Sequence, residues 1–398
     1  MYSIKELYKL GNGPSSSHTI GPLNATKVFL ERYSSVDYVK VILYGSLALT
    51  GKGHLTDYII NKTIYPVKCD IVFDIDTEQE HPNTLEFIGY KNNEFIGRML
   101  VYSVGGGAIK IAGEPERVLD KIYPISHFSE ISKYCSDNSI TLDQFVDRIE
   151  SKDFNDYLEV VYETMLESVS NGLSKEGTIP GNLQVKRKAK YIYNQATTES
   201  DLAEVARIKT VAYAYATAEE NASGGLIVTA PTCGASGVVP ACLKYALDLK
   251  KYNHDQIIKA LKIAGLIGNI VKENGSISGA EAGCQAEIGT ACAMAAAFLA
   301  SLDSDDISRI ERASEIALEH HLGLTCDPIE GYVQIPCIER NAVAALRAID
   351  SAKMAKYLSS TDSKISFDLV VETMLATGKD LHVNYRETSE GGLAKKYR

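Results

Sequence analysis

The sequence predicts an α+β fold, with a small N-terminal α/β domain over residues 1–145 and a larger, mainly α-helical domain over residues 146–398. Alternating runs of β-branched and aromatic residues, typical of strands, are confined to the N-terminal part. From about Thr141 onward, apolar residues recur at helical spacing and alanine becomes abundant. Strands followed by a long helical region indicate α+β architecture.

In the N-terminal domain, a short helix is expected first, followed by a loop over Gly11–Ile20 that Gly and Pro interrupt. A helix is expected from Ile20 onward, and another over Leu55–Ile60. Tyr38–Tyr44 alternates and is rich in β-formers, which predicts a strand. Further strands are expected over Ile71–Ile75, Thr84–Ile88 and Arg98–Val104.

The C-terminal domain is expected to consist of helices joined by Gly-rich loops. Their expected ranges are Asp153–Leu173, Ala203–Ala222, Val238–Ala246, His254–Val271, Thr290–Leu302, Asp305–Leu322, Ser351–Leu358 and Ser366–Thr377.

Composition excludes several classes of protein. The formal charge is −10 and no basic block stands out, so nucleic acid and anionic membrane are not expected partners. The segment Met1–Leu7 lacks an apolar signal core, and Ala291–Ala300 is too short to span a bilayer. Eight cysteines are too sparse for a disulfide scaffold, which favours reduced thiols and a cytoplasmic protein. A homodimer is expected.

Three cysteines lie in compact polar segments near the C-terminal end of the helical domain. Cys284 lies in Ser276–Glu287, Cys326 in GLTCDP, and Cys337 in QIPCIERN. Three thiolates leave a bound metal centre with one open position, which a substrate can occupy. Free cysteines also pack as small hydrophobic residues, and no CxxC pair decides between the two interpretations.

These segments resemble the iron–sulfur-dependent L-serine dehydratases, also called L-serine ammonia-lyases. That family carries NxSISGAExGCQxE, GLTCDP and QxPCIERN in this order. The resemblance implies that Cys284, Cys326 and Cys337 hold a [4Fe-4S] cluster. Gly275 and Glu330 depart from the family pattern without touching a proposed ligand, and Ala108 replaces an aromatic residue after a Gly triplet.

The N-terminal loop contains GPSSSHT, the sequence that opens the same family. Hydroxyls and free backbone N–H groups at a helix entry can hold a carboxylate, although Ser or Thr there can also be a simple helix cap. The resemblance favours a substrate role. The expected substrate-binding residues are Ser15, Ser16, Ser17 and Thr19.

Two histidines lie in N-terminal segments that match the family. His18 belongs to GPSSSHT and His54 to GKGH. The Gly51–His54 segment is not a phosphate-binding P-loop, because it lacks both the first glycine and the final hydroxyl of that pattern. Its place in the family segment makes His54, with His18, a candidate for acid–base catalysis.

A second hydroxyl-rich loop, Ser223–Gly237, precedes an apolar helix and suits an amino-acid carboxylate. It matches the family's TAPTxGxxG segment. Thr232 and Ser236 are therefore expected to bind substrate, whereas Cys233 occupies a variable position and is not an expected ligand.

The resemblance implies deamination of L-serine to pyruvate and ammonia. Removing the α-proton and expelling the β-hydroxyl are both difficult, and an iron with an open position can assist both as a Lewis acid. A positioned base would remove the proton, and no pyridoxal phosphate lysine is required.

Two other functions remain open from the sequence. Three cysteines could hold zinc in a hydrolase, although catalytic zinc usually takes His or mixed ligands. Alternatively, the N-terminal domain could serve a non-catalytic amino-acid sensor. Metal analysis separates the first alternative from the iron enzyme, and binding without turnover would support the second.

Overall fold

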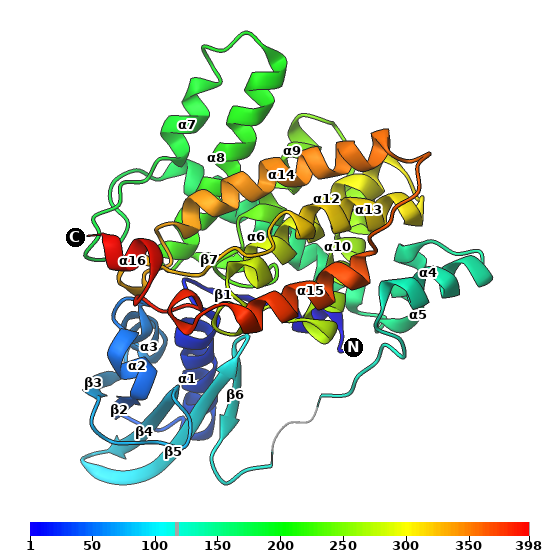
Figure 1. Cartoon of the computed structure of the whole chain (residues 1–398). Helices are drawn as coiled ribbons and strands as arrows, with labels where there is room; N and C mark the ends of the chain where they lie inside the picture. The colour runs from blue at the N-terminus through cyan, green and yellow to red at the C-terminus, as the bar shows by residue number, and fades with distance from the viewer. Residues whose placement is uncertain (116–118, 398) are drawn as a thin grey trace. The chain divides into compact units, whose positions relative to one another are not determined.

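The computed structural model describes residues 1–115 and 119–397. They form two compact units. The smaller is Gly11–Leu119 with Ser223–Gly225, and the larger is Met1–Leu10, Asp120–Ala222 and Leu226 onward. The small unit contains a sheet and the large unit is mainly helical (Figure 1), which confirms the predicted fold class. The domain boundary expected between residues 145 and 146 stays a prediction.

The small unit is built on a five-stranded sheet with strand order β3-β2-β4-β5-β6. Its strands are β2 (Tyr38–Tyr44), β3 (Lys68–Asp74), β4 (Thr84–Lys91), β5 (Glu94–Gly105) and β6 (Ala108–Ile111). Strands β2 and β3 run parallel and the other pairs are antiparallel. A parallel pair needs a crossover connection, and helices α2 (Gly45–Thr50) and α3 (Thr56–Ile64) provide it.

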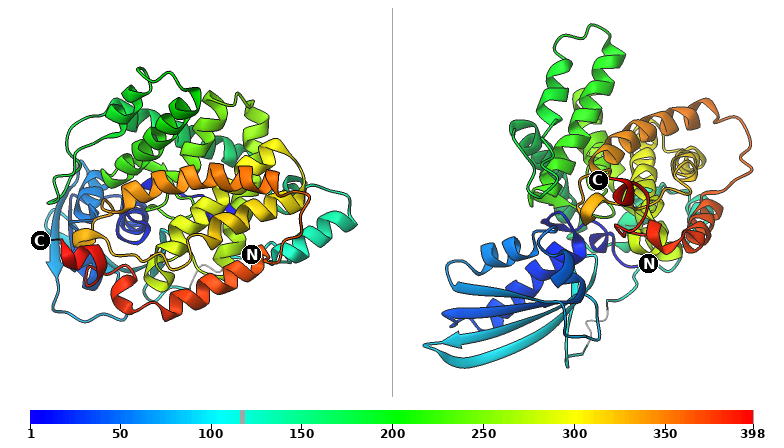
Figure 2. Two further views of the ribbon diagram at one scale, coloured as in Figure 1. Left: turned by 45° about the horizontal axis from the view of Figure 1, so that its top comes forward. Right: turned by 60° about the vertical axis from the view of Figure 1, so that its left-hand side comes forward.

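Helix α1 (Gly21–Arg32) lies with α3 on one face of this sheet (Figure 2). Phe29 of α1 stacks on Phe87 of β4, with ring centroids 5.0 Å apart. Both side chains are fully buried with the alternate residues Val39, Val41 and Leu43 of β2. The period-two alternation that predicted β2 is therefore the pattern that forms this core.

The large unit is a helical assembly. Its α-helices are α4 (Phe128–Asp137), α5 (Leu142–Ile149), α6 (Phe154–Ser174), α7 (Ala189–Gln195), α8 (Leu202–Ala222), α9 (Val238–Asp248), α10 (His254–Asn274), α11 (Gly279–Ala282), α12 (Thr290–Asp303), α13 (Ile307–Glu319), α14 (Cys337–Tyr357), α15 (Phe367–Asp380) and α16 (Gly392–Lys396). Short 3₁₀ turns are η1 (Ile4–Glu6), η4 (Ile329–Gly331) and η5 (Val383–Tyr385), and strand β1 (Leu10–Asn12) pairs with β7 (Leu226–Val228).

Helix α12 is the central helix of this unit. It packs against α9, α10, α13 and α14, and its alanines are buried on every side. A helix that is apolar all round belongs in a core. The stretch Gln285–Asp303, which includes α12, is long and apolar enough to cross a bilayer by composition, but 83% of its apolar window is buried inside the protein.

The expected helices and strands agree with the structure except in a few places. The sequence interpretation placed the start of α14 at Ser351, whereas the helix begins at Cys337. It also missed several short elements, namely β1, β6, β7, α2, α4, α5, α7, α11 and α16. In the structure Pro336 is the N-cap of α14, a position next to the helix start where proline removes no helical hydrogen bond.

Candidate active site

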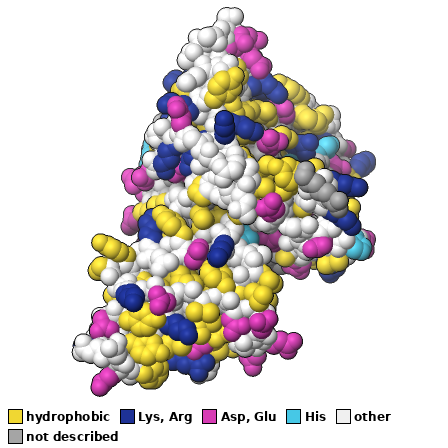
Figure 3. Space-filling view, turned by 90° about the vertical axis from the view of Figure 1, so that its left-hand side faces the viewer, with side chains coloured by type: hydrophobic (Ala, Val, Ile, Leu, Met, Phe, Trp, Pro, Cys, Tyr) yellow, Lys and Arg dark blue, Asp and Glu magenta, His cyan; other side chains and the backbone are white. Residues whose placement is uncertain are grey.

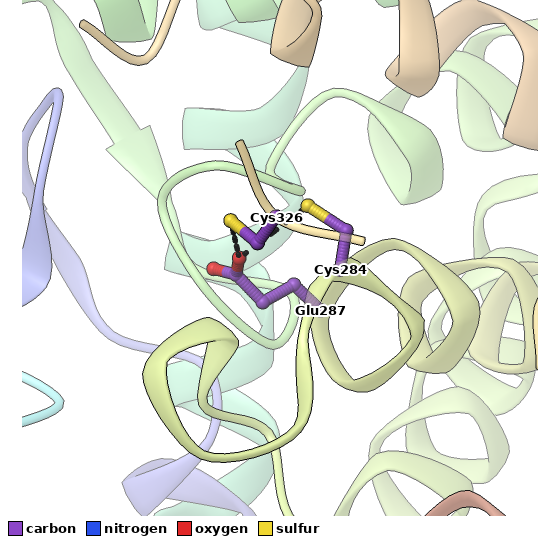
Figure 4. Close-up of side chains that lie close together, drawn as sticks. All are labelled: Cys284, Glu287 and Cys326. Carbon is purple, nitrogen blue, oxygen red and sulfur yellow. Dashed lines mark hydrogen bonds between the residues drawn. The ribbon is translucent and has the colours of Figure 1, made fainter. Parts of the chain in front are cut away.

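The large unit brings Cys284 and Cys326 together around the carboxylate of Glu287. Each sulfur lies 3.8 Å from Glu287 Oε2 (Figure 4). The ligand atoms of these three residues all lie within 4.8 Å of one another, close enough to hold one metal ion. Both cysteines are buried. Thiolate and carboxylate are both metal-binding groups, so the donor set suits a metal centre.

Three different local structures position the cysteines. Cys284 is the N-cap of a π-helical turn, η3 (Gln285–Gly289), that leads directly into α12. Cys326 lies in the loop between α13 and η4, and half-buried Cys337 is the first residue of α14. Segments distant in the sequence thus bring Cys284 and Cys326 together, whereas Cys337 is not part of the group of ligand atoms found within 4.8 Å of one another among the described residues.

Cys284 shifts the pKa of both other thiols. A hydrogen bond from Cys326 and the adjacent Arg340 guanidinium lower the pKa of Cys284 despite its burial. The same hydrogen bond raises the pKa of Cys326. Burial and then the Cys284 charge raise the pKa of Cys337. Of the three thiols, Cys284 is the one whose pKa is lowered, and the thiolate is the form that binds metal.

Glu287 also contacts the hydroxyl loop expected to hold substrate. Thr232 Oγ1 donates to Glu287 Oε1 at 2.8 Å. Burial, followed by the Cys284 charge, raises the pKa of Glu287 to about 8. Asn341 of α14 holds the same loop by donating to the Gly234 carbonyl at 2.7 Å and accepting from the Gly237 amide at 2.8 Å. Two of the cysteine segments thus anchor this loop.

The two expected substrate residues of this loop differ in their surroundings. Thr232 is half-buried beside the thiols, whereas Ser236 is fully buried. Within the described residues, Ser236 Oγ has no hydrogen-bond partner. Their roles in binding substrate stay predictions.

In the small unit, His18 and His54 lie side by side, with ring centroids 4.6 Å apart. Hydroxyls hold both nitrogens of His18, with Nδ1 2.9 Å from Ser17 Oγ and Nε2 2.9 Å from Ser46 Oγ. His54 Nδ1 lies 3.1 Å from the Thr50 carbonyl. The structure therefore pairs the two histidines that the sequence proposed as acid–base candidates.

Both histidines favour the neutral form. Burial, and then the proximity of His54, lower the pKa of His18 to about 3. Burial also lowers the pKa of His54. The neutral imidazole is the form that can accept a proton, but a pKa of about 3 makes His18 a weak base at neutral pH.

The serines and threonine of GPSSSHT form the turn that carries His18. Ser15 Oγ accepts from the His18 amide as the cap of a π-helical turn, η2 (Ser16–Ile20). Ser17 Oγ contacts the His18 ring, and Thr19 Oγ1 donates to the His54 carbonyl at 2.8 Å. Ser15 therefore caps the turn, and the substrate roles of Ser15, Ser16, Ser17 and Thr19 stay predictions.

Comparison with known proteins covers nearly the whole chain. The family model of the serine dehydratase alpha chain matches residues 76–394, and that of the beta chain matches residues 3–62. L-serine dehydratase 2 of Escherichia coli is 37% identical over 453 residues, covering 100% of this chain and 99% of that protein. The L-serine dehydratase of Helicobacter pylori strain 26695 is 39% identical over 451 residues, covering 99% and 98%.

The chain belongs to the L-serine dehydratase family. It is a single-chain member, because one chain matches the models of both the alpha and the beta chain. The resemblance drawn from the sequence segments is confirmed at the level of the family.

Sequence reasoning overlooked several residues of this serine dehydratase that surround the thiols. Glu287 and Arg340 each follow a cysteine by three positions, so helical spacing alone could have placed them beside Cys284 and Cys337. Gly279 could not be found in this way. A Cβ at Gly279 would lie 2.5 Å from Glu287 Oε2 and 3.3 Å from Cys326 Sγ, which explains why the position lacks a side chain.

Charges of both signs are mixed on the face of the molecule that Figure 3 draws. On the face drawn in Figure 3, the described Lys and Arg side chains are interspersed with Asp and Glu. The arrangement agrees with a net charge of −10 that is spread out and not gathered into blocks.

Proposed function

We propose that this protein deaminates L-serine to pyruvate and ammonia, with a [4Fe-4S] cluster held by Cys284, Cys326 and Cys337. The observation that supports the proposal most directly is the convergence of Cys284, Cys326 and Glu287 within 4.8 Å, in a chain similar over its full length to L-serine dehydratases.

The residues around the thiols fit such a group. Sulfur ligands are the donors that iron–sulfur clusters take. Gly279 leaves open the space that a Cβ would fill beside Cys326 Sγ, and Arg340 provides a positive charge next to the thiolate of Cys284. When bound, the cluster would supply Lewis acidity toward substrate oxygen atoms.

The protein's own groups supply the remaining functions in this proposal. Neutral His18 or His54 accepts the α-proton of the substrate, and hydroxyls of Ser15, Ser16, Ser17, Thr19, Thr232 and Ser236 bind its polar groups. Thr232 is held by Glu287, so its hydroxyl has a fixed direction. Fixed polar groups lower the reorganisation that a reaction requires.

The decisive experiment is anaerobic purification followed by iron and sulfide analysis and a pyruvate assay with L-serine. We expect iron and sulfide in near-equal amounts and pyruvate formation that is lost on exposure to air and chelator. Zinc in place of iron would point to a hydrolase instead. Binding of L-serine without turnover by the iron-loaded protein would point to a sensor.

The proposal includes a homodimer in the cytoplasm. Light scattering coupled to size-exclusion chromatography measures the oligomeric state directly, because a dimer has twice the 43.4 kDa mass of the chain.

A further inference from the structure

The part of the hydroxyl-rich loop that covers residues 229–237 has no regular backbone structure. It joins strand β7 to helix α9, and within it the Ser236 amide donates to the Cys233 carbonyl at 3.2 Å. Ala230, Cys233, Ala235 and Ser236 are all buried. A loop lacks the ladder of hydrogen bonds that fixes a helix or a strand, so the position of its hydroxyls depends on the segments that hold it.

Asn341 of α14 holds one end of the 229–237 loop with its whole side-chain amide. Its Nδ2 donates to the Gly234 carbonyl at 2.7 Å and to the Cys337 carbonyl at 2.9 Å. Its Oδ1 accepts from the Gly237 amide at 2.8 Å, and the residue is only 1% exposed. Both N–H groups of the amide are therefore used by the protein, and they join the loop to the cysteine that begins α14.

Helices α8 and α14 approach the loop closely at this end. A Cβ at Gly237 would lie 2.7 Å from the Ala214 carbonyl oxygen of α8 and 3.0 Å from Asn341 Oδ1. Both distances are shorter than an ordinary van der Waals contact, so a side chain at position 237 would displace the loop or its neighbours. The hydrogen bonds of Asn341 thus act on a backbone that α8 confines from another side.

Two other attachments hold the first half of the loop. The Lys9 amide donates to Thr229 Oγ1, and the Thr229 amide donates to the Lys9 carbonyl, both at 2.9 Å. Thr232 donates to Glu287 at 2.8 Å, and Glu287 faces two of the thiols. The loop is therefore tied to all three cysteine segments, and Asn341 provides the link to the third.

We propose that Asn341 is a positioning residue, whose amide sets where the hydroxyls of Thr232 and Ser236 lie relative to the cysteines. The inference rests on the proposed function, in which these hydroxyls bind the substrate. Asn341 acts through the loop, because backbone carbonyls already occupy both of its N–H groups. A misplacement of about 1 Å in such a site costs about 10²-fold in rate, so a displaced loop would hold the substrate poorly.

The first test is Asn341→Asp, which keeps the shape of the side chain and removes both N–H groups. The carbonyl oxygens of Gly234 and Cys337 would then face a carboxylate oxygen. With iron content and cluster absorbance unchanged, we expect the KM for L-serine to rise on the order of tenfold or more, with a smaller change in kcat. A normal KM in Asn341→Asp would overturn the proposal.

Asn269→Asp is the matched control. Asn269 of α10 is also 1% exposed, and its Nδ2 donates to the Tyr2 carbonyl at 2.7 Å, so the change breaks a comparable buried hydrogen bond in the same unit. It should lower the Tm, as Asn341→Asp does, and leave the KM unchanged. An equal rise of the KM in the control would show that the KM follows general loosening of the unit, which overturns the proposal.

A second variant decides if Asn341→Asp loses its iron. Asn341→Ala removes all three hydrogen bonds without placing a negative charge near the thiols. Full iron content with a raised KM in Asn341→Ala supports the proposal. Loss of iron, or a normal KM, in this variant overturns it.

The second test measures the loop without any reaction, by hydrogen–deuterium exchange of the full chain. In the wild type we expect the amides of residues 229–237 to be protected, since the Gly237 amide donates to Asn341 Oδ1. In Asn341→Ala their exchange should be on the order of tenfold faster or more, whereas exchange in α10 should not change. Rapid exchange of the loop in the wild type, or an unchanged rate in the variant, would overturn the proposal.

The two proposals can fail separately. If the wild type forms no pyruvate from L-serine, the proposed function fails, whereas hydrogen exchange still tests whether Asn341 fixes the loop. If the wild type forms pyruvate and Asn341→Asp has a normal KM, only the role of Asn341 is overturned.

Discussion

The histidine pair of the small unit and the cysteine site of the large unit differ in how fully the protein itself satisfies their polar groups. Both nitrogens of His18 have hydroxyl partners within hydrogen-bond distance, and both histidines favour the neutral form. At the cysteine site, by contrast, Glu287 forms no ion pair with a Lys or Arg among the described residues, and burial raises the pKa of its carboxyl to about 8.

This difference in hydrogen bonding and charge indicates that the histidine pair and the cysteine site have different roles. A histidine whose hydrogen bonds are complete in the free protein needs no bound ligand to fix its orientation. The carboxyl of Glu287 has no ion-pair partner among the described residues, so a metal group bound beside it would supply the missing positive charge. Removal of a cysteine should therefore affect the bound group, whereas removal of a histidine should affect only the reaction rate.

The largest expected effect is the loss of a proposed cluster ligand. Changing Cys284, Cys326 or Cys337 singly to Ala should abolish the cluster absorbance and pyruvate formation, because a cluster held by three thiolates cannot easily lose one. Iron analysis of anaerobically purified variants measures this directly.

Other cysteines are the controls for that experiment. Changing Cys69, Cys135, Cys242 or Cys292 to Ala should leave the iron content unchanged and cost only packing stability. Cys242 and Cys292 are fully buried and donate to carbonyls of α14. Equal iron loss in ligand and control variants would contradict the assignment of ligands.

The next effect concerns the histidines. His18→Ala and His54→Ala should keep the cluster absorbance, and one of them should lose on the order of 10²-fold or more in kcat, as expected when a positioned base is removed. Anaerobic steady-state kinetics with iron-replete protein provides the measurement. Normal turnover by both variants would place the base elsewhere.

A glycine pair tests the space around Glu287. A Cβ at Gly279 would meet Glu287 Oε2 at 2.5 Å, whereas a Cβ at Gly234 would meet Glu287 Oε1 at 3.5 Å, an ordinary contact. Gly279→Ala should therefore cost about 1–3 kcal/mol of stability and lower the iron content, since overpacking forces neighbours to move. Gly234→Ala should retain the iron, and an equal loss in both variants would show that local space does not matter.

The sequence predicted regular elements well because their patterns are local. The alternation in β2 and the apolar surface of α12 are visible in short windows, and the structure buries them as expected. Strand β6 has only four residues, two of them small or polar, and so had no pattern to detect. Its position depends on antiparallel pairing with β5, which is a tertiary interaction.

The residues of the site could be predicted from the sequence only where they lie in segments shared with the family. Those segments named three cysteines, and the structure places Cys284 and Cys326 around a common carboxylate. Glu387 shows the limit of such reasoning. Its backbone pairs with that of Cys326 across about sixty residues of chain, and no local pattern encodes that pairing.

The smallest expected effect is a pH dependence of stability that arises from His18. Its pKa is about 3 in the folded protein, compared with an ordinary value of 6.5. Between these two values the unfolded chain binds a proton that the folded chain does not. Stability should therefore be complete above about pH 6.5 and fall as the pH drops toward 3. Calorimetry at pH 7.5 and pH 5 should show a drop in Tm of a few degrees that is smaller in His18→Gln, which cannot titrate. An identical drop in wild type and variant would show that His18 binds protons equally in both states, and the contrast between the histidine pair and the cysteine site would lose its electrostatic basis.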